Sequence, residues 1–182
     1  MLSVVKNMSL DRRKLIIITM LMLLLLGSLF GFGLEKTTYR DENEYLLPEE
    51  MIRQIAVETK DMTYREIIKY GLKATSKALH FSEKNDMING SANCVGYSQV
   101  CSSICNYAFT INKYTYRARP VVGYVTFCGI NICRILHTLL PRRYKGMVKD
   151  HDFVELELDE GIILFDPSLF DFHINATTVM RK

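Results

Sequence analysis

The chain has 182 residues, of which 48% are hydrophobic, enough for one domain and an additional segment. Its net charge of +3 is confined to the start, because four of the 23 basic and one of the 20 acidic residues lie in positions 1–34, which leaves 19 of each in positions 35–182. The main part of the chain is therefore neutral, which argues against nucleic acid as a partner.

The first predicted element is a membrane span. Leu15 to Leu34 is an uncharged run of 20 residues, long enough to cross the hydrocarbon core of a bilayer. The run is apolar on all sides and so does not suit a helix buried in a globular core. A cleaved signal peptide is the alternative, with Gly31 and Gly33 as small residues before a cut, but the run is longer than a usual signal core. We expect an uncleaved anchor that binds the chain to the membrane.

Basic residues predict how the span is oriented. Four of them precede the run, and two follow it within a similar distance. Because positive residues stay cytoplasmic, residues 1–14 form a predicted cytoplasmic tail and the C-terminal domain of this single-pass protein lies on the non-cytoplasmic side. The expected order is then an anchor at 15–34, a polar tether and first helix at 35–61, and an α+β domain at 62–182.

Two helices are predicted before the middle of the chain. Pro48 opens the first, which runs to about Lys60. Thr63 and Glu66 have the spacing of a capping box, and the helix that they open should run to about Leu79. Residues 80–93 are rich in Asn, Asp, Gly and Ser, which is typical of a loop.

The third predicted helix begins with a cysteine. It runs from Cys94 to about Ile111, and its buried stripe includes Tyr97 and Cys101. Cys94 lies three residues before Tyr97, so it shares the face that points into the domain. A helix N-terminus favours a thiolate over a thiol, as a nucleophile requires. An inert core cysteine would occupy the same position, so a catalytic role depends on partners further along the chain.

Strands dominate the second half. Tyr114 to Phe127 is rich in tyrosine and valine and alternates in character, whereas residues 128–150 are ambiguous and end in a basic cluster that suits a solvated turn. His151–Leu158 and Ile162–Asp166 flank Asp159-Glu160-Gly161, which predicts a hairpin.

The hairpin register brings a histidine and an aspartate together. If Asp159 and Glu160 form a two-residue loop, paired positions sum to 319, which places Asp166 opposite Phe153. Phe153 lies two residues from His151 and on the same face, so Asp166 becomes a diagonal neighbour of His151 at about 7–8 Å by backbone. A slip of one residue would put the two side chains on opposite faces.

Cys94, His151 and Asp166 are therefore the candidate catalytic residues. The imidazole would take the thiol proton and the carboxylate would hold the imidazole. The backbone N–H of Cys94 is the expected first oxyanion donor, with Asn89 or Asn93 as candidates for the second. No CxxC or HxxxH pair accompanies these residues, so neither a metal nor a cofactor is predicted.

The other cysteines have structural explanations. Five cysteines outside the cytoplasm are an odd number, which leaves at least one thiol free. Cys128 and Cys133 are close enough in sequence to close a disulfide loop, although this pairing is left open. Cys101 and Cys105 lie inside the predicted helix and suit small core residues.

Four stretches resemble the transglutaminase-like superfamily. They are residues 97–108 of the cysteine-bearing helix, the strand YRARPVVGYV at 116–125, HDFVEL at 151–156 and FDPS at 165–168. Together they span roughly residues 62–168. The chain departs from the family at Asp152, where a small residue is usual, in having no tryptophan, and between Phe127 and Asp150. The resemblance implies a papain-like core, in which a cysteine-bearing helix packs on an antiparallel sheet.

The expected function is that of a membrane-anchored thiol hydrolase or acyltransferase. It would act on peptide or carboxamide bonds of a protein or peptide substrate, since the family chemistry includes peptide hydrolysis, amide transfer to lysine and deglycosylation of asparagine. The alternative is a catalytically inactive module that keeps the fold for binding or assembly at the membrane.

Overall fold

The computed structural model describes residue 22 and residues 31–40, 45–139 and 150–181. Most of the predicted membrane span, the predicted cytoplasmic tail and the basic cluster near residue 143 lie outside these residues. Within the described residues, no helix has both the length and the apolar character needed to cross a membrane.

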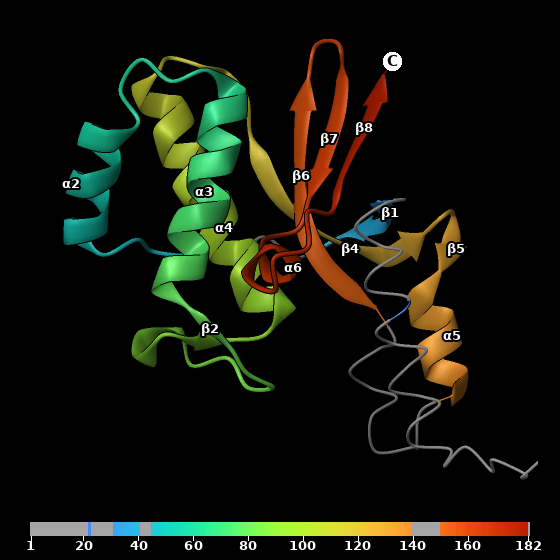
Figure 1. Cartoon of the computed structure of the whole chain (residues 1–182). Helices are drawn as coiled ribbons and strands as arrows, with labels where there is room; N and C mark the ends of the chain where they lie inside the picture. Colours follow the sequence, from blue (N-terminus) through green and yellow to red (C-terminus); the bar gives the residue numbers. More distant parts are fainter. Residues whose placement is uncertain (1–21, 23–30, 41–44, 140–149, 182) are drawn as a thin grey trace, which may run out of the picture.

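A curled antiparallel sheet forms the centre of the fold (Figure 1). Its order is β1-β4-β6-β7-β8, and a short β5 continues from β4 as a hairpin. The described strands of this sheet are β1 (Phe32–Tyr39), β4 (Ala118–Phe127), β5 (Ile130–Asn131), β6 (His151–Leu158), β7 (Gly161–Phe165) and β8 (Thr177–Arg181). The sheet curls far enough for Phe32 of β1 to bridge Ala176, which precedes β8.

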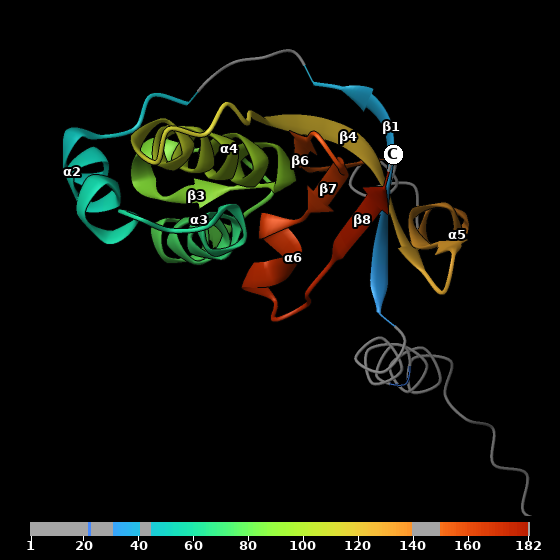
Figure 2. The same cartoon turned by 90° about the horizontal axis from the view of Figure 1, so that it is seen from above.

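Helices cover one face of this sheet. The described helices are α2 (Glu49–Glu58), α3 (Tyr64–Ala78), α4 (Cys94–Ile111), α5 (Ile132–Leu139) and α6 (Pro167–Asp171). Helix α4 packs directly on β4 and β6, and α3 lies beside α4 (Figure 2). Helix α5 lies on the opposite side of the sheet from α4. The coarse expectation of an α+β fold with an antiparallel sheet is confirmed.

The sequence explains where the two central helices begin. Thr63 caps α3, and the reciprocal bonds between Thr63 and Glu66 form the predicted capping box. Asn93 caps α4 through its side chain, which accepts a hydrogen bond from the N–H of Val95 at 3.0 Å. The predicted bounds of α4, Cys94 and Ile111, are those observed.

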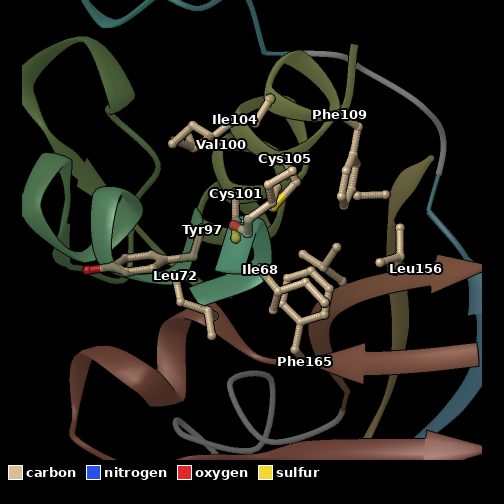
Figure 3. Close-up of a cluster of buried hydrophobic side chains, with 14 of the residues drawn as sticks. Ile68, Leu72, Tyr97, Val100, Cys101, Ile104, Cys105, Phe109, Leu156 and Phe165 are labelled. Atoms are coloured by element: carbon tan, nitrogen blue, oxygen red, sulfur yellow. Dashed lines mark hydrogen bonds between the residues drawn. The ribbon is translucent and has the colours of Figure 1, made fainter. Parts of the chain in front are cut away.

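The core divides between the two faces of the sheet. On the helical face, Leu156 and Phe165 pack against α3 and α4, with Tyr97 and Phe109 of α4 in the same cluster (Figure 3). On the other face, Phe153 packs in a second cluster, which includes Leu34, Val121, Cys133 and Leu164. Alternate residues of β6 pack in the two clusters, so the strand is packed on both faces. The candidate site lies at the first residues of this strand.

Strand β1 corrects two predicted boundaries. Phe32–Leu34 was expected to end the anchor and residues 35–39 to belong to a tether, yet both pair with β4 as one strand. Leu34 is buried at 4% exposure in the second cluster, and this tertiary contact outweighs the apolar run that precedes it. The close approach of β1 to β4 also requires Gly123, because a Cβ atom there would lie 2.0 Å from the carbonyl oxygen of Glu35.

Two smaller expectations are also corrected, and one ambiguous segment is now defined. Residues 80–93, predicted as loop, contain the short parallel pair β2 (His80–Phe81) and β3 (Ser91–Ala92) and a 3₁₀ turn at Met87–Asn89. The ambiguous segment after Phe127 contains β5 and α5. Strand β4 begins at Ala118 rather than Tyr114, since the rings of Tyr114 and Tyr116 stack on each other and pack edge-on against Phe109 of α4.

Candidate active site

The β6–β7 hairpin has the predicted register. Val154 pairs with Phe165 and Leu158 pairs with Gly161, so Asp159 and Glu160 are the two-residue loop. Continuing the ladder by one step places Asp166 opposite Phe153. The register therefore puts His151 and Asp166 on the same face of the sheet.

The imidazole and the carboxylate are in contact. His151 Nε2 lies 2.5 Å from Asp166 Oδ2, and Asp166 is buried at 1% exposure. The second carboxylate oxygen, Oδ1, accepts hydrogen bonds from Ser168 N at 2.9 Å, Ser168 Oγ at 2.8 Å and Leu169 N at 3.0 Å. Asp166 thus caps α6 with one oxygen and binds His151 with the other, so its orientation is fixed by the backbone.

The environment favours a protonated His151. Burial alone would lower the pKa of this side chain, but the charge and hydrogen bond of Asp166, together with the hydrogen bond and charge of Cys94, raise the pKa well above its usual value. The contact with Asp166 is made through Nε2. An imidazolium beside a cysteine is the arrangement that stabilises a thiolate.

Cys94 stands at the first position of α4 and is half-buried. Its interaction with His151 joins the helix to β6, while the interaction of His151 with Asp166 joins β6 to the end of β7. The structure therefore places His151 in contact with Asp166, and the thiol of Cys94 helps to raise the pKa of the same imidazole. Cys101 and Cys105 are fully buried in the core, as predicted.

Two further residues at the site were not predicted. Asp152 is buried at 1% exposure, and its Oδ2 accepts a hydrogen bond from Cys94 Sγ at 3.8 Å. Arg40 binds Asp152 with both arms of its guanidinium, since Nε lies 2.7 Å from Oδ1 and Nη2 lies 2.7 Å from Oδ2. Asp152 had stood out in the sequence as a departure from the family pattern, but nothing in the sequence linked it to Arg40.

The asparagines suggested as second oxyanion donors are engaged elsewhere. Asn89 Nδ2 donates to Asp86 Oδ2 at 2.8 Å, within the 3₁₀ turn. Asn93 caps α4 through Oδ1, and its Nδ2 donates to the Glu83 carbonyl oxygen at 3.4 Å. Both side chains therefore stabilise local structure in front of α4.

The possible disulfide between Cys128 and Cys133 is not formed. Cys128 is exposed, Cys133 is buried, and both are free thiols. Cys128 has a positive φ of 51° at the turn between β4 and β5, and Cys133 packs in the core cluster with Val121 and Phe153. The two side chains therefore lie in different environments, one on the surface and one in the core. In the described part of the chain, no group of three potential metal ligands is found.

A large cavity lies elsewhere on the molecule. It has a volume of about 880 Å³ between α3 and the β7–β8 strands, and apolar side chains such as Ile68, Leu72 and Val179 line it. None of the three candidate catalytic residues contributes to its wall. The candidate site is thus defined by contacts between side chains and not by this cavity.

Comparisons with protein-family models, curated proteins and solved structures find no match to this chain. The family resemblance consequently depends on the four sequence stretches quoted above. The structure itself establishes an α+β fold with an antiparallel sheet, in which His151 contacts Asp166.

Proposed function

We propose that this protein is a membrane-anchored thiol hydrolase or acyltransferase that acts on peptide or carboxamide bonds. The observation that carries the proposal is the contact of His151 with the buried carboxylate of Asp166, together with the raised pKa of His151, to which Cys94 at the start of α4 contributes. The order of the three residues along the chain, and the packing of α4 on an antiparallel sheet, also agree with a papain-like, transglutaminase-like core.

The proposed reaction has two stages. In the reactive form His151 holds the proton of Cys94, and the thiolate attacks the carbonyl carbon, so that a bond from sulfur to carbon forms and the amide C–N bond breaks. His151 returns that proton to the leaving amine. In the second stage, His151 takes a proton from water or from an acceptor amine, which attacks the thioester. The C–S bond breaks, the sulfur leaves as a thiolate beside the protonated His151, and the product is a carboxylic acid or a new amide.

Asp166 has an orienting role in this scheme. Its contact with Nε2 orients the imidazole, and its negative charge stabilises the imidazolium that forms when the thiol loses its proton. The carboxylate does not need to exchange a proton itself. Its three further hydrogen bonds at the start of α6 keep it from rotating away.

A non-catalytic binding module is the second candidate, and Asp152 favours it. A carboxylate that accepts a hydrogen bond from the thiol opposes thiolate formation, because it adds negative charge next to the sulfur. In that case the same contacts would serve to hold α4 against β6. The two candidates differ in whether Cys94 can form an acyl-enzyme.

The acyl-enzyme can be tested without knowledge of the natural substrate. Full-length protein is mixed with p-nitrophenyl acetate, and the acetyl group is located by mass spectrometry. The proposal predicts an acetyl group on Cys94 that turns over, with release of acetate, and both steps should fail in His151→Asn. Acetylation of exposed Cys128 in preference to Cys94 would support the binding module instead.

The membrane anchor is tested separately. We expect the native protein to resist carbonate extraction and residues 35–182 to be accessible to protease from the non-cytoplasmic side. A soluble form beginning near Phe32 or Leu34 would support the signal peptide. A cut directly before Leu34 would remove Phe32 and Gly33 of β1, which pair with Phe127 and Thr126 of β4.

A further inference from the structure

Two titratable side chains interact with the Cys94 thiol. One is His151, and the other is the carboxylate of Asp152, which lies 3.8 Å from the sulfur. Asp152 alternates with His151 along β6, and it is buried at 1% exposure. A buried carboxylate beside a thiol has to be compensated, because a like charge disfavours the thiolate.

Arg40 supplies this compensation. It follows the last residue of β1, and both of its contacting nitrogens lie 2.7 Å from Asp152 oxygens. A planar guanidinium that binds both oxygens of one carboxylate fixes the position of that carboxylate as well as its charge. The pKa of Arg40 is raised, chiefly by the hydrogen bonds to Asp152, with burial opposing and with charges including that of Cys94 adding to the rise.

We propose that the Arg40–Asp152 ion pair is a positioning pair for the nucleophile: Arg40 holds and neutralises Asp152, so that the Cys94 proton passes to His151 and is not retained by the carboxylate. Asp152 in turn accepts the hydrogen bond that fixes the sulfur at the N-terminus of α4. Neither residue touches the reacting carbonyl. The catalytic role of the ion pair rests on the proposed function. The effect of the ion pair on the ionisation of the Cys94 thiol can be measured without it.

The charged groups around the thiol can be named from each element. Strand β6 contributes His151 and Asp152, the end of β7 contributes Asp166, and the residue after β1 is Arg40. Asp150, just before β6, also acts on Arg40. With Arg40 in place, Asp152 is matched by one positive charge and Asp166 by another on a protonated His151.

The pH dependence of Cys94 alkylation measures this coupling directly. Full-length wild type, Asp152→Asn, Arg40→Gln and the double variant are treated with iodoacetamide between pH 4.5 and 9.5, and the rate at each cysteine is read by mass spectrometry. Exposed Cys128 is an internal reference in every tube. The midpoint is the pH at which the alkylation rate of Cys94 is half its maximum. We expect Asp152→Asn to lower this midpoint by about one pH unit, because a negative charge is removed, and Arg40→Gln to raise it by about as much. The midpoint of the double variant should lie within about 0.3 pH units of the wild-type midpoint, since the two changes in charge cancel.

A second ion pair between the same strands is the matched control. Lys36 of β1 lies 2.5 Å from Glu155 of β6, and this contact does not involve the thiol. Lys36→Gln therefore removes a buried pair of similar kind and should leave the Cys94 midpoint unchanged. If Lys36→Gln shifts the midpoint as much as Arg40→Gln does, the effect is one of general destabilisation and the proposal is wrong.

The remaining outcomes are also decisive. Equal midpoints for wild type and Asp152→Asn would overturn the inference, as would a double variant whose shift is not reduced by cancellation. If Arg40→Gln does not fold, Arg40→Lys keeps the charge without the two-pronged contact and should give a smaller upward shift. If the Cys94 midpoint shifts in Asp152→Asn but not in His151→Asn, the coupling of the ion pair to the thiol is supported, whereas the transfer of the proton to His151 and the proposed function are both wrong. The reverse pattern would leave the function and remove the inference.

Discussion

His151 and Asp166 meet diagonally across the β6–β7 hairpin, with 2.5 Å between Nε2 and Oδ2, although the residue opposite Asp166 is Phe153. The diagonal position leaves the second carboxylate oxygen free to cap α6. One side chain therefore orients the imidazole and begins a helix. This double role makes Asp166 the residue at which stability and activity are most closely connected.

Replacement of Asp166 should separate its two roles. Asp166→Asn retains an oxygen that can accept the α6 hydrogen bonds but lacks the charge that holds an imidazolium, so activity should fall by about 10³- to 10⁴-fold while the fold remains. Asp166→Ala loses the cap as well, so its free energy of unfolding should be lower than that of Asp166→Asn by about 1–2 kcal/mol. Turnover and urea denaturation of the two variants measure the two effects. Equal stability of Asn and Ala variants would contradict the capping role.

Removal of the nucleophile should have the opposite profile. Cys94→Ala should abolish acyl transfer and change the free energy of unfolding by less than about 0.5 kcal/mol, because the half-buried sulfur contributes little packing. Cys101→Ala is the control within the same helix: it is fully buried and should cost about 1 kcal/mol while activity is spared. If Cys101 proved essential and Cys94 dispensable, the mechanism would be wrong.

The raised pKa of His151 predicts how stability varies with pH. Its ordinary value is 6.5, and the folded value lies well above this. Between these two values the folded chain binds the proton more tightly, so the contribution is fully present below about pH 6.5 and is lost as the pH rises through the folded pKa. Urea denaturation from pH 6 to 9 should show wild-type stability falling more steeply than that of Asp166→Asn. Parallel curves would show that the Asp166 charge does not act on His151.

Gly123 should be intolerant of any side chain. It lies between Lys36 of β1 and His151 of β6, and an added Cβ would meet backbone of Glu35 at 2.0 Å. Since backbone cannot rotate away, Gly123→Ala should cost about 3 kcal/mol or more. The control is Gly33→Ala, whose Cβ would meet side-chain hydroxyls and no backbone: Thr126 Oγ1 at 2.6 Å, which can rotate away, and Thr178 Oγ1 at 3.8 Å. Thermal denaturation of both variants checks the contrast.

Local signals were sufficient for much of the site. The Asn93 cap and the apolar stripe predict the start of α4 at Cys94, and the two-residue loop at Asp159 and Glu160 predicts the register that brings His151 to Asp166. Both are short-range effects, fixed by capping and turn geometry. They predict the helix start at Cys94 and the contact of His151 with Asp166, whereas the approach of Cys94 to His151 requires α4 to pack on β6.

The parts that were missed depend on long-range contacts. Arg40 and Asp152 are separated by 112 positions, and each has the sequence pattern of an ordinary surface charge. Their contact can be predicted only from the sheet order β1-β4-β6, which brings the end of β1 near the start of β6. Strand β1 was itself missed, because Phe32 and Leu34 continue an apolar run and their pairing with β4 has no local signature. The second core cluster, which contains Leu34, was hidden for the same reason.

The alkylation rate of Cys94 as a function of pH, compared with that of Cys128 in the same sample, tests the central claim most directly. If His151 activates Cys94, wild-type Cys94 should react at least about tenfold faster than exposed Cys128 at pH 5.5, and His151→Asn should remove that advantage. Cys94 that reacts no faster than Cys128 at pH 5.5, with a rate unchanged in His151→Asn, would contradict the account.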